Sequence, residues 1–585
     1  MRAISLSVVF GFSLNLSAQT PATFTRIGSQ DEMVQDLFPG AQRAVPVIAD
    51  FNNDGFLDIY YGGENNADWP TENPLTLSWA QLSNLVVNNG NGTYTTLYEA
   101  TTGIPVSARS VYFPLDYNND GYLDLLISNG ENAASSPLPT ECTILVKNLG
   151  NNTFERVENA GFRMTSNQKK LQKNISVGDY NKDGLVDVLI ISEGGEPNNG
   201  FRHVELYKNN GDDTFTVQLI AQDKAGTPID ETEKDYLVGS FYSSSAGSVD
   251  FADIDNDGWL DIVTTGYSDF APNTAVHIYK NLEGTAFKDI TPDNMAGKGV
   301  YNGTAKVADI DNDGYLDILL LGIGADGQQA TLWMNDGSGN FSSIPALENG
   351  LIPVEANYAT FADLNHDGYL DIIYTGKRSD RRVWICYQGS AGTFTLDETY
   401  PIVLVGADGA TAVADLDNNG TLDVFVAGKT SDVNKVNDVF TTYESLARIY
   451  SNTTEDVTNI PPTTPTNFQA SLVEGKLNLT WDAASDDRLM EDALTYNVFV
   501  KNNATNKIFS LIPANIASGQ VKAFTDLQVA THRTDFSIDI DADATYTVGV
   551  QSIANGFAAS PFATLVVNET NGVQAVASDS KKPSC

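Results

Sequence analysis

Short aliphatic runs recur along the chain, and successive pairs of them flank a polar turn. Lys306-Val307-Ala308 precedes one such turn, and Leu316-Asp317-Ile318-Leu319-Leu320 follows it. After a variable segment a third run ends in Asn and Gly, and a turn leads into a fourth run with an aromatic residue, as in residues 85–94. Asn-Gly signals between such runs indicate antiparallel hairpins. Each repeat is therefore expected to form a four-stranded sheet.

The polar turns share a nine-residue pattern, whose positions we number 1 to 9. In the copy from Asp309 to Asp317, acidic side chains occupy positions 1, 3, 5 and 9, and glycine occupies position 6. This spacing resembles the first half of an EF-hand calcium loop, in which glycine permits a sharp turn. Here the closing carboxylate comes at position 9, and strands flank the loop. One copy could be an acidic hairpin turn, but seven copies favour a cation site.

The seven acidic loops, called loop 1 to loop 7, begin with aspartate at Asp50, Asp116, Asp179, Asp253, Asp309, Asp363 and Asp415. Position 3 is Asn52, Asn118, Asn181, Asp255, Asp311, Asn365 and Asp417, and position 5 is Asp54, Asp120, Asp183, Asp257, Asp313, Asp367 and Asn419. Position 9 is Asp58, Asp124, Asp187, Asp261, Asp317, Asp371 and Asp423. The oxygen count and spacing predict Ca²⁺ at these loops. Loop 7 is expected to be the weakest, because an amide replaces a charged ligand.

Seven repeats of four strands predict an all-β fold with a seven-bladed β-propeller. A small β-sandwich is expected to follow it, as the resemblance given below for residues 466–568 implies. The last repeat supports closure of the ring. No fourth run follows Asn452, whereas Ala22 to Ile27 matches one. We therefore expect the N-terminal strand to complete the seventh blade.

The repeats resemble the FG-GAP/VCBS repeats of integrin-α-type propellers over about residues 20–455. In that family, such loops join neighbouring strands of a blade and bind Ca²⁺ on one face of the ring. The resemblance implies up to seven structural Ca²⁺ ions, with the side chains above as ligands. It also implies that the backbone carbonyl of position 7 completes each site, at Phe56, Tyr122, Leu185, Trp259, Tyr315, Tyr369 and Thr421.

The chain is expected to divide into five parts. A basic start, an apolar run and Ser17-Ala18 predict a Sec signal peptide over residues 1–18. The mature chain is therefore expected to be exported and to lie outside the cell or at its surface, with the periplasm as the alternative. The propeller is expected over 19–458 and a Pro-rich linker over 459–465. Residues 466–568 resemble a fibronectin type III domain, with Trp481 ending its second strand and Tyr546 in a tyrosine-corner strand. Residues 569–585 are expected to be disordered.

Composition narrows the choice of partner. The 585 residues carry a formal net charge of -41 and include 42% hydrophobic residues, so the chain can bury a large core. No basic stripe is present, which argues against nucleic acid. No other stretch could span a membrane, and a monomer is expected. Cys142 and Cys386 fall in strands of different blades and are expected to be buried free thiols.

A ligand is expected on the face opposite the acidic loops, where the connections are long and variable. Trp69, Trp79 and Tyr242 could stack on sugar rings or anchor a protein there. Basic residues gather there too, and they could bind an acidic glycan or a carboxylate-bearing partner. They include Arg43, Arg109, Arg378 and Arg382, together with Lys169, Lys170, Lys173, Lys377 and Arg381. The alternative is that the rings pack on the blade rims and that the charges are solvated.

These features favour a secreted or surface module that binds glycan or protein, as an adhesion-type protein does. Catalysis has little support, because the four histidines are scattered and no G-x-S-x-G or H-E-x-x-H pattern occurs. A calcium-dependent polysaccharide lyase or glycoside hydrolase on the same scaffold is the alternative.

Overall fold

The computed structural model describes residues 21–27, 38–41, 45–66, 79–107, 110–128, 143–162, 175–193, 202–230, 241–242, 245–268, 274–378, 381–399, 401–402, 409–429, 445–454, 459–523 and 527–568. The fold is all-β. Its short helical segments are α1 (Glu99–Thr102), α2 (Ala346–Asn349), η2 (Asp293–Met295), η3 (Glu491–Ala493) and η4 (Leu527–Val529). Within the described residues, no helix is long and apolar enough to cross a membrane.

Seven antiparallel sheets follow one another along the chain, and we number them 1 to 7 after their acidic loops. Sheet 1 contains β2 (Val47–Ala49), β3 (Asp58–Asn66), β4 (Trp79–Asn88) and β5 (Tyr94–Tyr98), and sheet 2 contains β6 (Val111–Leu115), β7 (Asp124–Ser128), β8 (Thr143–Asn148) and β9 (Phe154–Arg156). Sheet 3 contains β10 (Ile175–Gly178), β11 (Asp187–Glu193), β12 (Arg202–Asn209) and β13 (Phe215–Gln218). Sheet 4 contains β15 (Ser245–Ala252), β16 (Asp261–Tyr267), β17 (Thr274–Asn281) and β18 (Phe287–Asp289), and β14 (Ala221–Gln222) adds a parallel edge strand that the repeat pattern did not predict.

The remaining repeats have the same order. Sheet 5 contains β19 (Tyr301–Ala308), β20 (Asp317–Gly324), β21 (Gly327–Asn335) and β22 (Phe341–Ile344), and sheet 6 contains β23 (Glu355–Ala362), β24 (Asp371–Lys377), β25 (Arg381–Ser390) and β26 (Thr393–Leu396). Sheet 7 contains β27 (Ala410–Ala414), β28 (Asp423–Lys429), β29 (Ser445–Asn452) and β1 (Phe24–Arg26). The pairing of Phe24 with Asn452 and of Arg26 with Tyr450 confirms the predicted return of the N-terminal strand.

The repeats fit a propeller-like β-structure. The first strands of neighbouring sheets contact one another in the order β2, β6, β10, β15, β19, β23 and β27, and β27 contacts β2 again. Most hydrophobic clusters of the repeat region join two neighbouring sheets, and a small one joins Val45 with Val111 of sheet 2 and Ala410 of sheet 7. Leu85 of sheet 1 packs with Leu125 of sheet 2, and Phe425 of sheet 7 packs with Tyr61 of sheet 1. Core packing therefore lies mainly between sheets that follow one another.

The acidic loops join the first and second strands of each sheet, as the pattern predicts. Position 9 is always the first residue of the second strand, and it pairs with the last residue of the first strand. In sheet 5, for example, Asp317 pairs with Ala308. A tight turn therefore brings positions 1 and 9 of every loop to the same end of the sheet.

The C-terminal unit, residues 466–568, is built from two further sheets. One has the order β30 (Thr466–Val473), β31 (Lys476–Asp482) and β34 (Asp535–Asp539). The other has the order β33 (Ile508–Ser510), β32 (Thr495–Asn502), β35 (Tyr546–Ile553) and β36 (Ala563–Val567). A separate cluster that includes Trp481, Tyr496 and Val548 fills the space between them.

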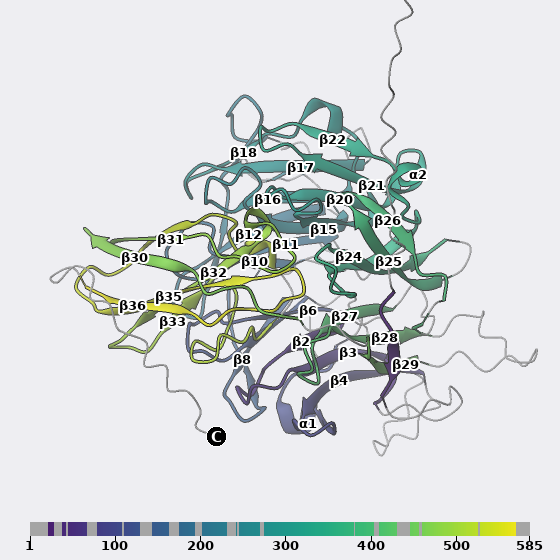
Figure 1. Cartoon of the computed structure of the whole chain (residues 1–585), viewed down its shortest axis with the longest axis horizontal. Coiled ribbons are helices and arrows are strands. Elements are labelled where there is room, and N and C mark those ends of the chain that lie inside the picture. Colours follow the sequence, from purple (N-terminus) through teal and green to yellow (C-terminus); the bar gives the residue numbers. More distant parts are fainter. Residues whose placement is uncertain are drawn as a thin grey trace, which may run out of the picture.

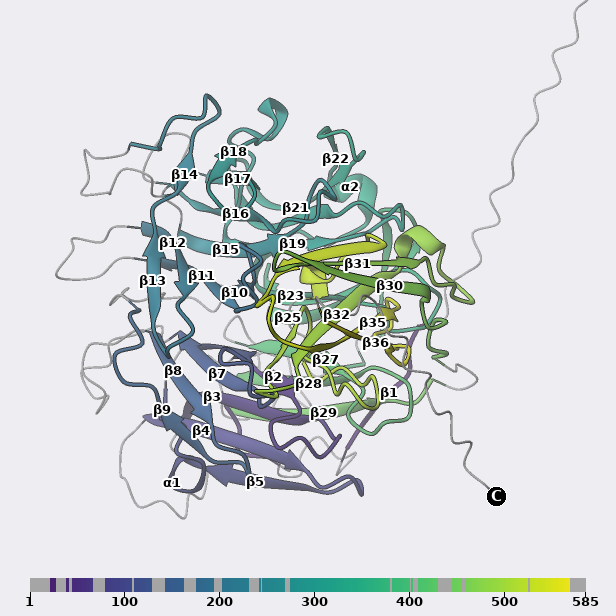
Figure 2. The same cartoon turned by 90° about the vertical axis from the view of Figure 1, so that its left-hand side faces the viewer.

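The C-terminal unit packs against one end of the repeat sheets. Its strands, green to yellow, lie to the left of the repeat sheets in Figure 1 and in front of them in Figure 2. Ile512, Val521, Val529 and Ile553 of this unit belong to the same buried cluster as residues of sheets 3 and 4. The contact is therefore partly hydrophobic, and it lies on the end of the sheets that carries the acidic loops.

Candidate metal centres

Each acidic loop is closed by hydrogen bonds from its own backbone. The position 1 carboxylate accepts from the N–H of position 5 and from the N–H of the position 6 glycine, at 2.8–3.1 Å in all seven loops. The N–H of position 7 donates to the position 5 side chain, and Asn419 keeps this bond in loop 7 at 2.7 Å. These bonds fold each loop into a tight turn with its acidic side chains close together, and several carboxylate oxygens near one point are what a hard cation needs.

Two positions in every loop have left-handed backbone conformation. Position 6 is glycine, with φ between 79° and 92°, where a side chain would be strained. Position 4 also has positive φ in all seven loops, and asparagine, which tolerates this region well, occupies five of them. Lys182 and His366 are the two departures.

The carboxylates converge most clearly in three loops. Within the described residues, one oxygen from each of positions 1, 3 and 9 lies within 4.8 Å of the others in loops 4, 5 and 7. Oδ1 of Asp255 and Oδ1 of Asp311, both at position 3, are buried and have no hydrogen-bond partner. Buried carboxylate oxygens without a donor are costly. The carboxylates of positions 1, 3 and 9 in these loops therefore fit a divalent cation.

Electrostatics point the same way. Burial, reinforced by the neighbouring carboxylates, raises the pKa of Asp58 and Asp317 to about 8 and that of Asp116, Asp253 and Asp309 to about 7. Backbone N–H donors oppose these shifts but do not cancel them. A bound cation would favour the ionised form of each group. The loops are therefore strained electrostatically unless protons or a cation neutralise them.

An amide clamp links every loop to the preceding sheet. The last residue of the third strand, or its counterpart Gln388 in sheet 6, donates its backbone N–H to the position 9 carboxylate at 2.7–3.0 Å. Its side-chain amide donates at 2.7–2.9 Å to the position 2 carbonyl of the preceding loop: Asn88 to Leu416, Asn148 to Phe51, Asn209 to Tyr117, Asn281 to Tyr180, Asn335 to Ile254, Gln388 to Ile310 and Asn452 to Leu364. The bond from Asn88 to Leu416 joins sheet 1 to sheet 7. Sequence reasoning found these asparagines as turn signals but missed this role.

Two lysines reach into the loops from the third strands. Lys280 donates to Asp255 and to Asp257 of loop 4, the latter at 2.7 Å. Lys208 pairs with Asp183 of loop 3 at 3.0 Å. Burial alone would lower the pKa of Lys280, but the two carboxylates raise it above its ordinary value. Both ammonium groups therefore remain charged beside the predicted ligands.

The C-terminal unit covers the loop face mainly by donating to loop carbonyls. Gln520 donates to the carbonyl of Gly55 at 3.0 Å and contacts Asn418 at 3.5 Å, so it bridges loops 1 and 7. Lys522 donates to the carbonyl of Gly121 at 3.0 Å, and its own carbonyl accepts from the N–H of Asp50 at 2.9 Å.

The same mode of contact continues around the face. Arg533 donates to the carbonyl of Asn256 at 2.5 Å, Asn555 donates to the carbonyl of Gly368 at 3.1 Å, and Arg488 donates to the carbonyl of His366. The N–H of Asp539 donates to the carbonyl of Lys182 in loop 3 at 3.0 Å, and Asn555 also donates to Oδ1 of Asn312 in loop 5 at 3.0 Å, so all seven loops contact the C-terminal unit.

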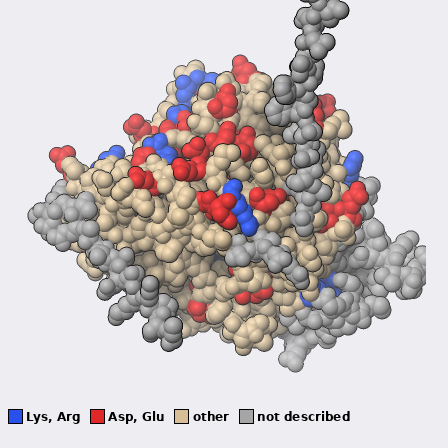
Figure 3. Space-filling model, in the orientation of Figure 1, with Lys and Arg blue, Asp and Glu red and all other residues tan. Residues whose placement is uncertain are grey.

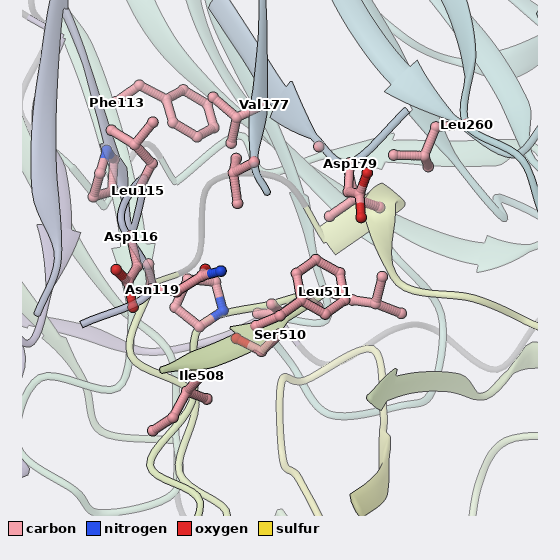
Figure 4. A pocket seen from close by; sticks show the side chains of 18 residues that line it. Phe113, Leu115, Asp116, Asn119, Val177, Asp179, Leu260, Ile508, Ser510 and Leu511 are labelled. Atoms are coloured by element: carbon pink, nitrogen blue, oxygen red, sulfur yellow. The ribbon is translucent and has the colours of Figure 1, made fainter. Parts of the chain in front are cut away.

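The seam between the C-terminal unit and the sheets is closely packed. Figure 4 shows a small pocket at this seam, lined by Phe113 and Val177 of the sheets and by Ile508 and Leu511 of the C-terminal unit, with a volume of only about 50 Å³. A second cavity of about 220 Å³ lies between loops 3 and 4, and Lys182 and Arg533 contribute to its wall. The ammonium of Lys182 lies 4.2 Å from the ring centroid of Trp259.

The described residues test only part of the expected ligand face. Tyr242 is half-buried and stacks on His277 with ring centroids 4.9 Å apart, as in the alternative of rim packing. Arg378 is exposed just after β24. Arg43, Trp69 and Arg109 lie outside the described residues, as do the side chains of Trp79 and Arg382.

Two of the described histidines and the described cysteine lie in buried surroundings. His366 is buried and His532 is half-buried, and desolvation of the ring lowers the pKa of each to about 4. Cys386 is a buried free thiol, as predicted. Cys142 lies outside the described residues.

On the face shown in Figure 3, Asp and Glu outnumber Lys and Arg.

Comparison with protein families gives one match that spans most of the repeat region. The sequence model described as an FG-GAP-like repeat matches residues 50–127, 116–190, 179–264, 253–320, 309–374 and 363–426. Each match starts at position 1 of a loop, and loop 7 falls at the end of the last one. No curated protein sequence gives a significant match.

Solved structures resemble the chain only distantly. A fungal alcohol oxidase of the AA5 family in complex with copper is 11% identical, with 91% of this chain and 98% of that chain covered and a TM-score of 0.42. The extracellular domain of a putative hybrid two-component system from B. thetaiotaomicron is 10% identical, with 94% and 58% covered and a TM-score of 0.37.

Proposed function

Because the chain belongs to the FG-GAP-like repeat family, we propose that it is a calcium-stabilised, seven-bladed propeller that binds a glycan or a protein at a surface. Calcium is structural in this proposal, and each of the seven loops is a site. Its ligands are the side chains of positions 1, 3, 5 and 9 and the carbonyl of position 7. Export by a signal peptide over residues 1–18 and an extracellular or surface location belong to the same proposal.

The observation that carries the calcium proposal is the repeated crowding of carboxylates at one end of the sheets. Position 9 is fully buried in every loop, with 0% exposure for Asp58 and Asp317. Each of these carboxylates also accepts from the amide clamp, so an ion bound to it would support the contact between two sheets. The cost of leaving several such charges buried without a counter-ion is high. Calcium supplies the missing positive charge.

We further propose that the C-terminal unit is a fibronectin type III-like domain. Three features support this proposal: the two sheets with orders β30-β31-β34 and β33-β32-β35-β36, the buried Trp481 on β31, and the hydroxyl of Tyr546, which donates to the carbonyl of Asp541 at 3.1 Å. The last bond is the kind that a tyrosine corner makes.

The C-terminal unit covers the face that carries the acidic loops, so we look for a ligand-binding surface on another part of the molecule. Because the C-terminal unit occupies the end of the sheets that carries the loops, a large partner would bind the opposite end or the rim. Trp69, Trp79 and the arginines named above remain candidates for that surface. Variable connections on a rigid scaffold commonly carry recognition.

Calcium binding is tested by thermal unfolding of the mature chain with millimolar Ca²⁺ and with excess EGTA, alongside direct measurement of bound Ca²⁺. One site held at 100 times its Kd contributes about 2.7 kcal/mol to the free energy of unfolding. We expect several bound ions and a large drop in melting temperature on chelation. An identical melting curve in EGTA would contradict the proposal.

Ligand binding is tested on a glycan array and by capture of surface proteins, with Trp69→Ala and Trp79→Ala as variants. Loss of binding in these variants, with an unchanged melting temperature, would support the opposite end as the recognition surface. Incubation with acidic and neutral polysaccharides separates binding from catalysis. New reducing ends or unsaturated products would favour the lyase or hydrolase alternative.

A further inference from the structure

Loops 4 and 5 have the same predicted ligand side chains but different neighbours. Both have aspartate at positions 1, 3, 5 and 9. The residue before the clamp asparagine is Lys280 in sheet 4 and Met334 in sheet 5. Lys280 bonds to the carboxylates of positions 3 and 5, whereas Met334 can offer no charge.

We infer that Lys280 is an intrinsic cation of loop 4, which holds the loop closed without calcium and makes it a weaker calcium site than loop 5. This inference rests on the proposed calcium function. It assigns different roles to loops that the sequence pattern treats as equivalent. Loop 4 would keep its shape when the calcium concentration falls, and loop 5 would not.

The geometry explains both parts of the inference. The ammonium of Lys280 lies 2.7 Å from Oδ2 of Asp257 and also contacts Oδ2 of Asp255. These two carboxylates supply positions 3 and 5, so the lysine reduces the negative charge available to an incoming ion by one unit. The side chains of the three residues are about one-third exposed, at 30%, 31% and 33%, so their attraction is only partly screened. Oδ1 of Asp255 has no hydrogen-bond partner, so loop 4 keeps an oxygen for calcium.

In the other sheets, the residue that precedes the clamp asparagine contacts its loop less strongly than Lys280 does. Lys208 of sheet 3 contacts only the position 5 carboxylate of its loop. Ser451 of sheet 7 donates to Asp417 at 3.1 Å but carries no charge. Lys147 of sheet 2 makes no ion pair within the described residues. The double contact of Lys280 is therefore the strongest case within the described residues.

Loop 4 also carries its own spectroscopic reporter. Its position 7 residue is Trp259, and the corresponding residue of loop 5 is Tyr315. Terbium replaces calcium at oxygen-rich sites and luminesces when a nearby tryptophan is excited. The ring of Trp259 also lies beside Lys182 of loop 3, so the part of the terbium signal that is lost in Trp259→Phe reports loops 3 and 4, and its change in Lys280→Met reports loop 4.

The experiment exchanges the two residues. In Lys280→Met, we expect the Trp259-dependent terbium signal to appear at a concentration at least about tenfold lower than in the wild type, because a nearby positive charge is removed. Lys280→Arg keeps the charge and is expected to bind as the wild type does. In Met334→Lys, calorimetry is expected to show at least one calcium site weakened by a similar factor.

A second measurement reports the ion-free state. In EGTA, hydrogen exchange of residues 253–261 is expected to be slower than that of residues 309–317 in the wild type, and Lys280→Met is expected to remove the difference. If the wild type takes up calcium but Lys280→Met changes neither the terbium signal nor the hydrogen exchange, the inference about Lys280 is wrong and the proposed function still stands. If the wild type takes up no calcium, the proposed function fails with it.

Discussion

The clamp asparagine of sheet 5 offers a direct test of how the sheets hold together. Asn335 is 4% exposed, and its side-chain amide donates to the carbonyls of Ile254 at 2.9 Å and Leu316 at 3.2 Å. Its side-chain oxygen accepts from the N–H of Gly337 at 3.1 Å. Three hydrogen bonds at about 1 kcal/mol each, together with two buried carbonyls left unpaired, predict that Asn335→Ala lowers the free energy of unfolding by about 3–5 kcal/mol.

The assay is guanidinium-induced unfolding in saturating calcium, followed by fluorescence and by circular dichroism. The backbone N–H of Asn335 donates to Asp317 at 2.7 Å. Alanine keeps this N–H, so calcium affinity should change much less than stability. Asn340→Ala is the matched control, because Asn340 is exposed and donates only to Asp336 in the same sheet. The control should change stability by less than about 0.5 kcal/mol. Equal effects of the two substitutions would refute the clamp.

Three further outcomes are expected. The ion-free fold raises the pKa of Asp58 and Asp317 from 3.8 to about 8. Between about pH 4 and pH 8 the folded chain therefore binds more protons than the unfolded chain, and its free energy of unfolding should fall as the pH rises. Melting curves should then show a larger stabilisation by calcium at pH 8 than at pH 5. Arg533→Ala should weaken the seam, because the carbonyl of Asn256 loses its donor, and faster hydrogen exchange in residues 253–261 would reveal it. Cys386 is fully buried and its pKa is raised to about 12, chiefly by burial, so mass spectrometry should find it alkylated only after unfolding.

Local patterns were sufficient to predict the loops and most of the strands. Glycine at position 6 and aspartate at position 9 define a turn that enters a strand, and in the structure position 9 is the first residue of the second strand in every sheet. The N-terminal strand could also be predicted, because the last repeat lacked its fourth run. The short edge strand β14 could not, since Ala221–Gln222 has no strand pattern of its own.

Long-range contacts to backbone atoms could not be predicted. Asn335 lies next to a recognisable turn, but its partner is the carbonyl of Ile254, which has no side-chain signature. The docking of the C-terminal unit was missed for the same reason, because Gln520, Lys522 and Arg533 donate to carbonyls that any sequence would provide. The contact of Lys280 with loop 4 depends on how far a flexible side chain reaches, and strand periodicity does not give that distance.

The pairing of β1 with β29 has a consequence for biosynthesis. β1 emerges early from the ribosome but cannot pair until β29 has been synthesised. Thr25 pairs with Ser451, which is added more than four hundred residues later. Until then the nascent polypeptide has a gap between its first and last sheets. If translation stopped before Asn452, the edges of the first and last sheets would remain unpaired and could bind other polypeptides. Completion of β29 brings the two ends of the repeat region together.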